Sequence, residues 1–280
     1  MSTIHWLGNE DCHAEGLVGG KAAMLSRLAA LHAVPPGFAI AALPASAPAL
    51  PEPLLHPLAQ AYSLLADRCG MPEPAVAVRS SALDEDGAAA SFAGQHDTYL
   101  NIRGSDAVRA AVERCIRSAA SPEAVAYRTQ RGLPLDDVRI AVLVQQLVPS
   151  EVSAVVFSAN PITGSRDEVM INASWGLGES IVGGSVTPDT FVARKRDGEV
   201  TLRDVASKRY MTVMTQSGTA EVPVPGELEN ACTLTDDQVR AMTELAVKLE
   251  AAAGRPVDIE CAIADNQLYL LQCRPITTLR

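Results

Sequence analysis

Four polar side chains near the carboxyl end of the sequence have the types and spacing of a metal and phosphate site. Asp258 and Glu260 alternate with apolar residues in one β-rich run, and Gln272 and Arg274 do so in the next. The other face of this second run is expected to carry Tyr269, Leu271 and Cys273. A three-residue loop centred on Asn266 would place Glu260 opposite Gln272 and Asp258 opposite Arg274. Carboxylate and amide oxygens suit Mg²⁺, and a planar guanidinium suits a phosphate. A surface salt bridge is the alternative interpretation, and a one-residue slip in register would separate the pairs.

A second set of candidate residues surrounds the apolar run that ends at Arg79. A charged residue directly after a buried strand lies where many α/β folds bind ligands, so Arg79 is a candidate for binding phosphate. The stretch that follows includes Ser91-Phe92-Ala93-Gly94-Gln95, whose small residues and glycine allow backbone N–H groups to approach phosphate oxygens. A flexible surface loop is the alternative interpretation of this stretch.

The third set is Gly19-Gly20-Lys21, which opens a predicted helix that runs to about His32. A lysine gains nothing from the dipole at a helix N-terminus, so its position there indicates an anion that both could bind. The segment is not a P-loop, because Ala22 follows the lysine and Glu15 occupies the position of the first glycine.

The first half of the sequence is rich in predicted helices. Leu25, Leu28 and Leu31 are expected near one face of the first helix, and Pro35-Pro36-Gly37 follows it. Residues 41–53 are expected to form a loop. The next helix is expected to bury five residues on one face, namely Leu54, Leu58, Tyr62, Leu65 and Cys69.

The second half is rich in predicted strands. Runs of β-favouring residues predict strands at 139–148, 152–159 and 168–173. Asp197-Gly198 predicts a hairpin turn between strands at 191–196 and 200–204. A capping box at Thr235-Asp236-Asp237-Gln238 predicts the start of a helix that Gly254 ends. Two final strands are expected at 257–264 and 268–273. The sequence therefore predicts an α+β protein of two lobes, residues 1–145 and 146–280.

Composition and charge argue against several classes of function. The 280 residues carry a formal net charge of −10, which disfavours binding to nucleic acid and to anionic lipid. The sequence has no apolar run long enough to span a membrane and no signal peptide at its start. None of the six cysteines belongs to a CxxC pair, which is typical of reduced thiols. We therefore expect a cytoplasmic protein.

Taken in order, these segments resemble the N-terminal ATP-binding domain of the phosphoenolpyruvate synthase, pyruvate phosphate dikinase and rifampin phosphotransferase family. The matching blocks span nearly the whole sequence. The blocks are Gly19-Gly20-Lys21-Ala22, Pro35-Pro36-Gly37-Phe38, Val78-Arg79-Ser80-Ser81-Ala82, Glu85-Asp86, Ser91-Phe92-Ala93-Gly94-Gln95, Val144-Gln145-Gln146-Leu147-Val148, Ala173-Ser174-Trp175-Gly176-Leu177-Gly178-Glu179, Pro188-Asp189, Pro256-Val257-Asp258-Ile259-Glu260 and Gln272-Cys273-Arg274-Pro275. The resemblance implies an ATP-grasp fold, with the nucleotide in a cleft between two lobes.

The resemblance implies ATP and Mg²⁺ as cofactors and gives roles to the matching residues. Lys21 and Arg79 would contact the nucleotide phosphates, and Arg274 the terminal phosphate. These three cations are the expected catalytic residues, because phosphoryl transfer needs mainly positioning and neutralised charge. Glu260 and Gln272 would bind Mg²⁺.

The remaining roles implied by the resemblance belong to the backbone. The stretch from Gln146 through Leu147 to Val148 would bind the adenine edge, and the backbone near Gly94 would cover the phosphates.

Family members continue into a domain with a phosphorylated histidine, and none of the five histidines here has that context. Cys12-His13-Ala14 resembles the histidine motif only superficially, because it lies before the Gly-Gly-Lys block. We therefore expect a phosphotransferase component that passes a phosphoryl or pyrophosphoryl group to a histidine of a partner in trans, for onward transfer to a small molecule. A self-contained ATP-grasp kinase or ligase and a non-catalytic ATP-binding module are the alternatives.

Overall fold

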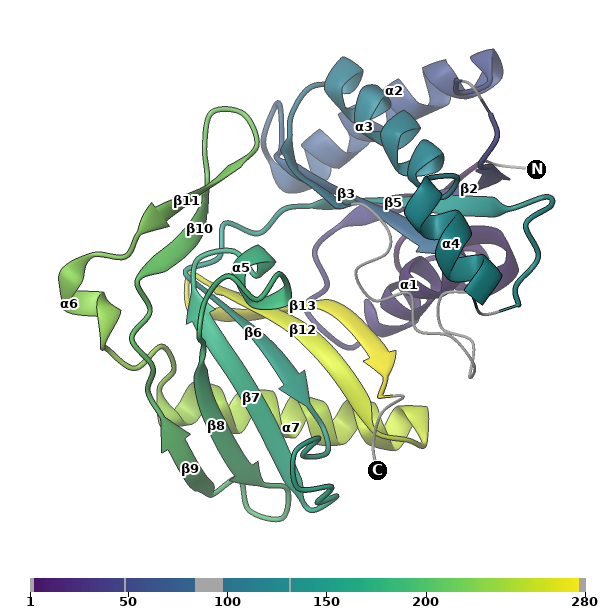
Figure 1. The fold of residues 1–280 in the computed structure, drawn as a ribbon. Coiled ribbons are helices and arrows are strands. Elements are labelled where there is room, and N and C mark those ends of the chain that lie inside the picture. The colour runs from purple at the N-terminus through teal and green to yellow at the C-terminus, as the bar shows by residue number, and fades with distance from the viewer. Residues whose placement is uncertain (1–2, 48, 84–97, 131, 277–280) are drawn as a thin grey trace. The chain divides into compact units, whose positions relative to one another are not determined.

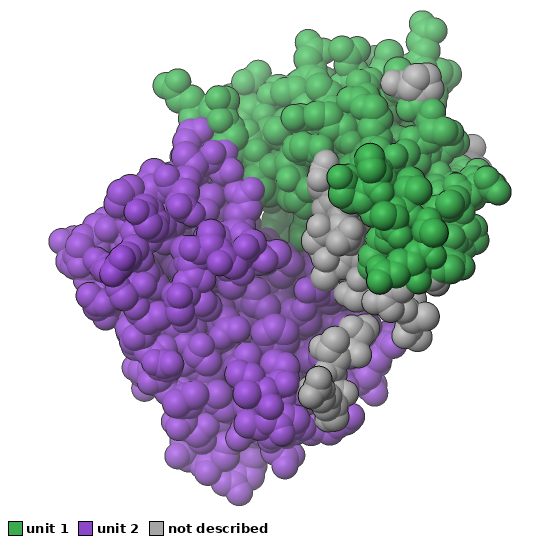
Figure 2. Space-filling view, in the orientation of Figure 1, with its two compact units in different colours: residues 1–147, 216–218 green, residues 148–215, 219–280 purple. Residues whose placement is uncertain are grey.

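The computed structural model describes residues 3–47, 49–83, 98–130 and 132–276. The chain divides into two compact units, Met1–Leu147 with Gln216–Gly218 and Val148–Thr215 with Thr219–Arg280 (Figure 2). Each unit contains an antiparallel sheet with packed helices (Figure 1), which confirms the predicted α+β class. The functional parts predicted for residues 1–145 and 146–280 stay a prediction.

Unit 1 is built on a five-stranded sheet. In spatial order its strands are β1 (Ile4–Trp6), β2 (Gly37–Pro44), β5 (Arg139–Gln146), β3 (Val76–Ala82) and β4 (Thr98–Ile102). Its helices are the 3-10 helix η1 (Glu10–His13), α1 (Glu15–Leu28), α2 (Glu52–Cys69), α3 (Ser105–Ser118) and α4 (Pro122–Gln130). Because β2 extends to Pro44, the loop expected over residues 41–53 is wrong in its first part.

The two faces of this sheet bury different side chains. Even-numbered residues of β2, β3 and β5, such as Phe38, Val78 and Val142, form one core with the apolar faces of α2 and α3. Helix α1 contacts β2, β3 and β5 and lies on the opposite face (Figure 1). Strand β3 pairs with β5 without interruption, so its odd-numbered residues Arg79 and Ser81 face α1.

Helix α1 contains a break at Gly19, whose backbone is left-handed with φ 77°. A Cβ at this position would lie 2.1 Å from the Ser81 carbonyl oxygen, so only glycine allows this close approach to β3. The helix resumes at Gly20-Lys21, as the sequence predicts, but ends at Leu28 rather than near His32. Leu31 is therefore 81% exposed, and its predicted place on the buried face is wrong.

Unit 2 is built on a six-stranded antiparallel sheet. In spatial order its strands are β13 (Gln267–Pro275), β12 (Val257–Ala264), β6 (Val152–Phe157), β7 (Glu168–Trp175), β8 (Asp189–Arg194) and β9 (Val200–Asp204). Helix α7 (Asp236–Ala253) lies across one face of the sheet (Figure 1), and the short helix α5 (Glu179–Val182) follows β7. The predicted capping box of α7 is confirmed, since Thr235 and Gln238 exchange hydrogen bonds.

A connection that the sequence analysis did not resolve links β9 to α7. It contains β10 (Tyr210–Met214) and β11 (Thr219–Pro223), which form a separate two-stranded sheet, and the short helix α6 (Gly226–Glu229). We call its unit 2 residues, 205–215 and 219–235, the arm. Many side chains of β10 and β11 are partly or fully exposed, so no regular apolar pattern indicates these strands in the sequence.

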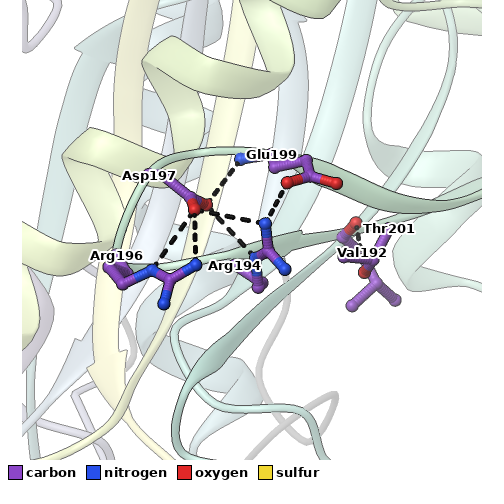
Figure 3. A network of polar contacts seen from close by, with 6 residues as sticks. All are labelled: Val192, Arg194, Arg196, Asp197, Glu199 and Thr201. Carbon is purple, nitrogen blue, oxygen red and sulfur yellow. Dashed lines mark hydrogen bonds and ion pairs between the residues drawn. The ribbon is translucent and has the colours of Figure 1, made fainter.

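The predicted hairpin between β8 and β9 is confirmed, and a polar network closes its turn (Figure 3). The Asp197 carboxylate accepts hydrogen bonds from the Glu199 N–H at 3.2 Å and from the guanidinium groups of Arg194 and Arg196. These hydrogen bonds lower the pKa of Asp197 to about 2. The bond from the Glu199 N–H is the largest cause, followed by those from Arg196 and then Arg194. Arg194 also pairs with Glu199.

The cysteines and the helices were each the subject of an expectation from the sequence. The six cysteines are free. Within the ranges that the structure describes, none of the helices is long and apolar enough to cross a membrane.

Candidate functional site

The β12–β13 hairpin has the register that the sequence predicts, but reaches it by a different route. Asp258 lies opposite Arg274 and Glu260 opposite Gln272. Ala264 pairs with Gln267, so the turn contains two residues, Asp265 and Asn266, both at positive φ. This shorter turn alone would shift the pairing by one residue, and an irregularity between Glu260 and Cys261 shifts it back.

Asp258 and Arg274 form a largely buried ion pair on this hairpin. The Nε and Nη2 atoms of Arg274 lie 2.8 Å and 2.7 Å from Oδ2 of Asp258. The Asp258 side chain is 10% exposed and that of Arg274 is 30% exposed. Burial raises the pKa of Asp258, the nearby Arg274 guanidinium opposes this rise, and Glu260 adds to it. Arg274 is therefore the neighbour that favours the charged form of this carboxylate, against the effect of burial.

The second oxygen of the same carboxylate has no such partner. Oδ1 of Asp258 is buried and accepts no hydrogen bond from any described residue. A buried acceptor without a donor is costly, so this oxygen is a natural ligand for a cation or an incoming donor.

A buried apolar cluster continues from these polar residues along the same face of the hairpin. Strand β12 pairs with β6 without interruption, so Asp258, Glu260, Ala262 and Ala264 share one face. Ala262 and Ala264 pack with Val148, and Tyr269 and Leu271 pack against this cluster. Strand β13 was expected to turn Tyr269 and Leu271 to the other face; the irregularity next to Glu260 makes that expectation wrong.

The backbone N–H groups of residues 146–148, where unit 1 ends and unit 2 begins along the chain, differ in their hydrogen-bond partners. The Gln146 N–H donates to the Pro36 carbonyl at 2.9 Å, and the Leu147 N–H donates to the Ala75 carbonyl at 2.8 Å. The Val148 N–H has no acceptor among the residues that the structure describes. Val148 is 5% exposed. It is therefore the residue of this stretch whose N–H is left for a ligand, and it belongs to the apolar cluster.

Unit 1 brings two of the predicted cations to the same strand. Lys21 Nζ donates to the Ser80 carbonyl at 2.9 Å, and the Ala22 N–H donates to Oγ of Ser81 at 3.1 Å. Arg79 precedes these serines and is 9% exposed. The strand was expected to end at Arg79; it runs to Ala82 because it stays paired with β5 over this whole length.

The predicted residues thus form two groups, one in each unit. Lys21 and Arg79 lie in unit 1, whereas the hairpin residues Glu260, Gln272 and Arg274 lie in unit 2. Gly94 and its neighbours lie outside the described residues. No group of three or more His, Cys, Asp and Glu side chains that could hold a metal occurs in the described part of the chain.

Two carboxylates and an amide nevertheless fit Mg²⁺. This ion commonly takes one or two protein carboxylates and completes its octahedral shell with waters and substrate phosphates. Asp258 and Glu260 are neighbours on one face of β12, Gln272 lies opposite Glu260, and Oδ1 of Asp258 needs a partner. The donor set is too small for a closed structural site and suits a metal that a ligand shares.

Sequence reasoning missed three contributors to these groups. It gave no role to the Ser80 carbonyl that binds Lys21, to Tyr269 beside the alanines, or to the second oxygen of Asp258. Every residue has a backbone carbonyl, so the sequence does not indicate which one Lys21 binds. The position of Tyr269 depends on the strand irregularity. The Asp258 oxygen could have been suspected from its alternation with Glu260.

Comparison with protein families matches residues 45–280 to the family described as "Pyruvate phosphate dikinase, AMP/ATP-binding domain". A phosphoenolpyruvate synthase of Pyrococcus furiosus is 42% identical over 241 residues, which cover 82% of this chain and 29% of that protein. A probable phosphoenolpyruvate synthase of Methanocaldococcus jannaschii is 42% identical over 232 residues, 82% of this chain and 20% of that protein. A rifampicin phosphotransferase of Streptomyces sviceus is 40% identical over 232 residues, 82% of this chain and 26% of that protein.

The chain spans about a fifth to a third of the length of the curated relatives it matches. The matched part is their nucleotide-binding part, and this domain is of the ATP-grasp type, which confirms the predicted fold and the resemblance. The match begins at residue 45, so the Gly19-Gly20-Lys21 block lies before it. On these grounds, the chain belongs to the AMP/ATP-binding domain family of pyruvate phosphate dikinase.

Proposed function

We propose that this chain binds Mg-ATP and transfers a phosphoryl or pyrophosphoryl group to a histidine of a partner domain or protein. The observation that supports this most directly is the hairpin face of unit 2, where an apolar cluster adjoins a row of acid, amide and guanidinium groups. A nucleotide has the same division, with an apolar base at one end and charged phosphates at the other.

The adenine would lie on the apolar part of this face. Its ring would contact Val148, Ala262 and Tyr269, and its edge would accept a hydrogen bond from the Val148 N–H. The Gln146 and Leu147 N–H groups already donate to carbonyls of unit 1. These two residues would therefore contact the adenine through their own carbonyl groups or by their shape. Apolar walls with one fixed backbone donor are typical of small-molecule sites.

The phosphates would lie along the polar part. Glu260 and Gln272, with Asp258 beside them, would hold Mg²⁺, which would neutralise phosphate charge when bound. Arg274 would bind the terminal phosphate. Lys21 and Arg79 of unit 1 would contribute further positive charge, and the backbone near Gly94 would cover the phosphates.

Nucleotide binding tests the first part of the proposal. Mg-ATP should raise the melting temperature of the purified protein, because a ligand that binds only the native state stabilises it. Glu260→Ala should weaken binding of ATP in the presence of Mg²⁺ much more than in its absence, and Gln272→Ala should do so less, since a neutral amide is the weaker ligand. Glu244→Ala, which removes an exposed carboxylate from α7, is the matched control. Equal effects of Glu260→Ala with and without Mg²⁺ would refute the metal role.

Transfer to a histidine is the second part. The protein alone should hydrolyse ATP slowly, because water lacks the positioning of a docked nucleophile. A histidine-bearing domain of a phosphoenolpyruvate synthase, added in trans, should become phosphorylated in an acid-labile form and accelerate ATP consumption. Rapid turnover with a purified small molecule and no partner would instead establish a self-contained kinase or ligase. Binding without turnover under either condition would indicate a non-catalytic module.

A further inference from the structure

One fully buried ion pair of unit 2 lies away from the proposed nucleotide site. The Asp189 and Lys208 side chains are both 0% exposed, and Lys208 Nζ lies 2.6 Å from Oδ1 of Asp189. Asp189 begins β8, whereas Lys208 belongs to the arm. Two charges removed from water cost several kcal/mol unless every lone pair and proton is used.

This carboxylate holds the two ends of the arm at once. At the start of the arm, its Oδ1 accepts hydrogen bonds from the Ala206 N–H at 2.9 Å and from Lys208 Nζ. At the end of the arm, its Oδ2 accepts from the Thr233 N–H at 2.9 Å and from the Thr233 hydroxyl at 2.8 Å. Four directional bonds therefore fix where the arm leaves and rejoins the sheet.

The arm in turn packs on the glycine-rich segment after β7. The Leu177 N–H donates to the Thr212 carbonyl of β10 at 2.8 Å, and the Trp175 indole donates to the Leu228 carbonyl at 2.9 Å. Gly176 has φ 76°, and a Cβ at this position would lie 2.3 Å from the Thr212 carbonyl oxygen. The arm thus lies in direct backbone contact with Gly176.

Gly176 also fixes the stretch that follows Val148. Its N–H donates to the Glu151 carbonyl at 2.8 Å. Its carbonyl accepts from the hydroxyls of Ser150 at 3.1 Å and Ser153 at 2.8 Å. The Ser150 N–H donates to the Val148 carbonyl at 2.8 Å. A continuous series of hydrogen bonds and contacts therefore joins the buried ion pair to the peptide that the adenine would contact.

We propose that Asp189 and Lys208 are positioning residues for the adenine end of the site, acting through the arm and Gly176 on Val148. The inference rests on the proposed function, because it concerns the same nucleotide site. A well-packed apolar pair would hold the arm at lower desolvation cost, whereas four directional bonds select one position of the arm.

The experiment compares two pairs of substitutions in a Trp6→Phe background, where Trp175 is the remaining tryptophan. Asp189→Asn with Lys208→Met removes both charges of the buried pair. Lys195→Met with Glu250→Gln is the matched control, because it removes another 2.6 Å ion pair of unit 2 that lies outside the arm. The measurements are the emission of Trp175 without nucleotide, the melting temperature, and the Kd for Mg-ATP.

The arm variant should shift the Trp175 emission and weaken Mg-ATP binding roughly tenfold, the scale of one misplaced hydrogen bond to the adenine. The control should change stability alone. A folded arm variant with the Kd of the parent protein, or a control weakened as much, would overturn the inference. If the arm variant does not fold, Thr233→Val decides, because it removes only the hydroxyl bond to Asp189. A weakened Kd in Thr233→Val supports the inference and an unchanged Kd refutes it.

Failure of the proposed function gives a different result. A parent protein that binds no Mg-ATP would refute nucleotide binding itself, whereas parent binding with unaltered variants refutes the positioning role alone.

Discussion

Replacing Arg274 by methionine should destabilise unit 2 in a pH-dependent way before any ligand is added. The substitution removes both contacts to Oδ2 of Asp258 and leaves a side chain that is 10% exposed without its counter-charge. Breaking a fully buried pair costs roughly 3–5 kcal/mol, and because Arg274 is partly exposed we expect about 2 kcal/mol at neutral pH.

The sign of the pH dependence follows from the pKa of Asp258. Burial raises this pKa above its usual range, so the native state binds the proton more tightly than the unfolded state. Stability attributable to Asp258 is therefore full below the unfolded pKa and is lost as the pH rises through the folded pKa. Without Arg274 the folded pKa rises further, so the difference between Arg274→Met and the parent should shrink as the pH falls.

Urea unfolding, followed by Trp175 emission in a Trp6→Phe background, measures the difference in unfolding free energy between Arg274→Met and the parent. Trp175 reports on unit 2 because it lies in β7. The series should run from about pH 5 to about pH 8. Arg274→Met combined with Asp258→Asn leaves no buried charge and should recover most of the lost stability. A loss that is equal at every pH, or a double variant no more stable than the single, would refute the reasoning.

Three further predictions concern single residues. Gly19→Ala should destabilise unit 1 by at least about 1–2 kcal/mol in urea unfolding, since a left-handed backbone and the Ser81 carbonyl at 2.1 Å both oppose a Cβ; Gly16→Ala, with nothing within 4 Å, should not. Thr235→Ala should lower the unfolding free energy by about 1 kcal/mol through loss of the helix cap, and Thr235→Ser should restore it. Lys21→Met should weaken ATP binding roughly tenfold or more in calorimetric titrations and leave adenosine binding unchanged, and equal losses for both would contradict a phosphate contact.

The register of the β12–β13 hairpin shows which features local sequence predicts and which it does not. Alternation placed Asp258, Glu260, Gln272 and Arg274 correctly, because a period of two is the strongest signal a strand has. The turn and the strand irregularity both differ from the expected geometry, and their effects cancel at the polar pairs. They do not cancel at Tyr269, which therefore lies on a different face from the one predicted.

Other errors have a common origin in pairing with distant segments. Residues 41–44 look like loop because alanine and proline dominate them, yet they add to β2 through pairing with β5. Strands β10 and β11 lack a regular apolar face and pair with each other, while the buried bonds of Asp189 fix the two ends of the arm that contains them. Local propensity contains no information on such partners.

The sequence by itself determined the α+β class, the capping box of α7, the polar pairs of the last hairpin and the family. Each of these depends on residue type and short spacing, which are properties of neighbouring positions. Only the tertiary structure decided that the Val148 N–H is the one left for a ligand, that Oδ1 of Asp258 lacks a partner, and that one carboxylate closes the arm. These depend on which distant donors reach each buried polar atom, and that is settled when the strands and helices pack.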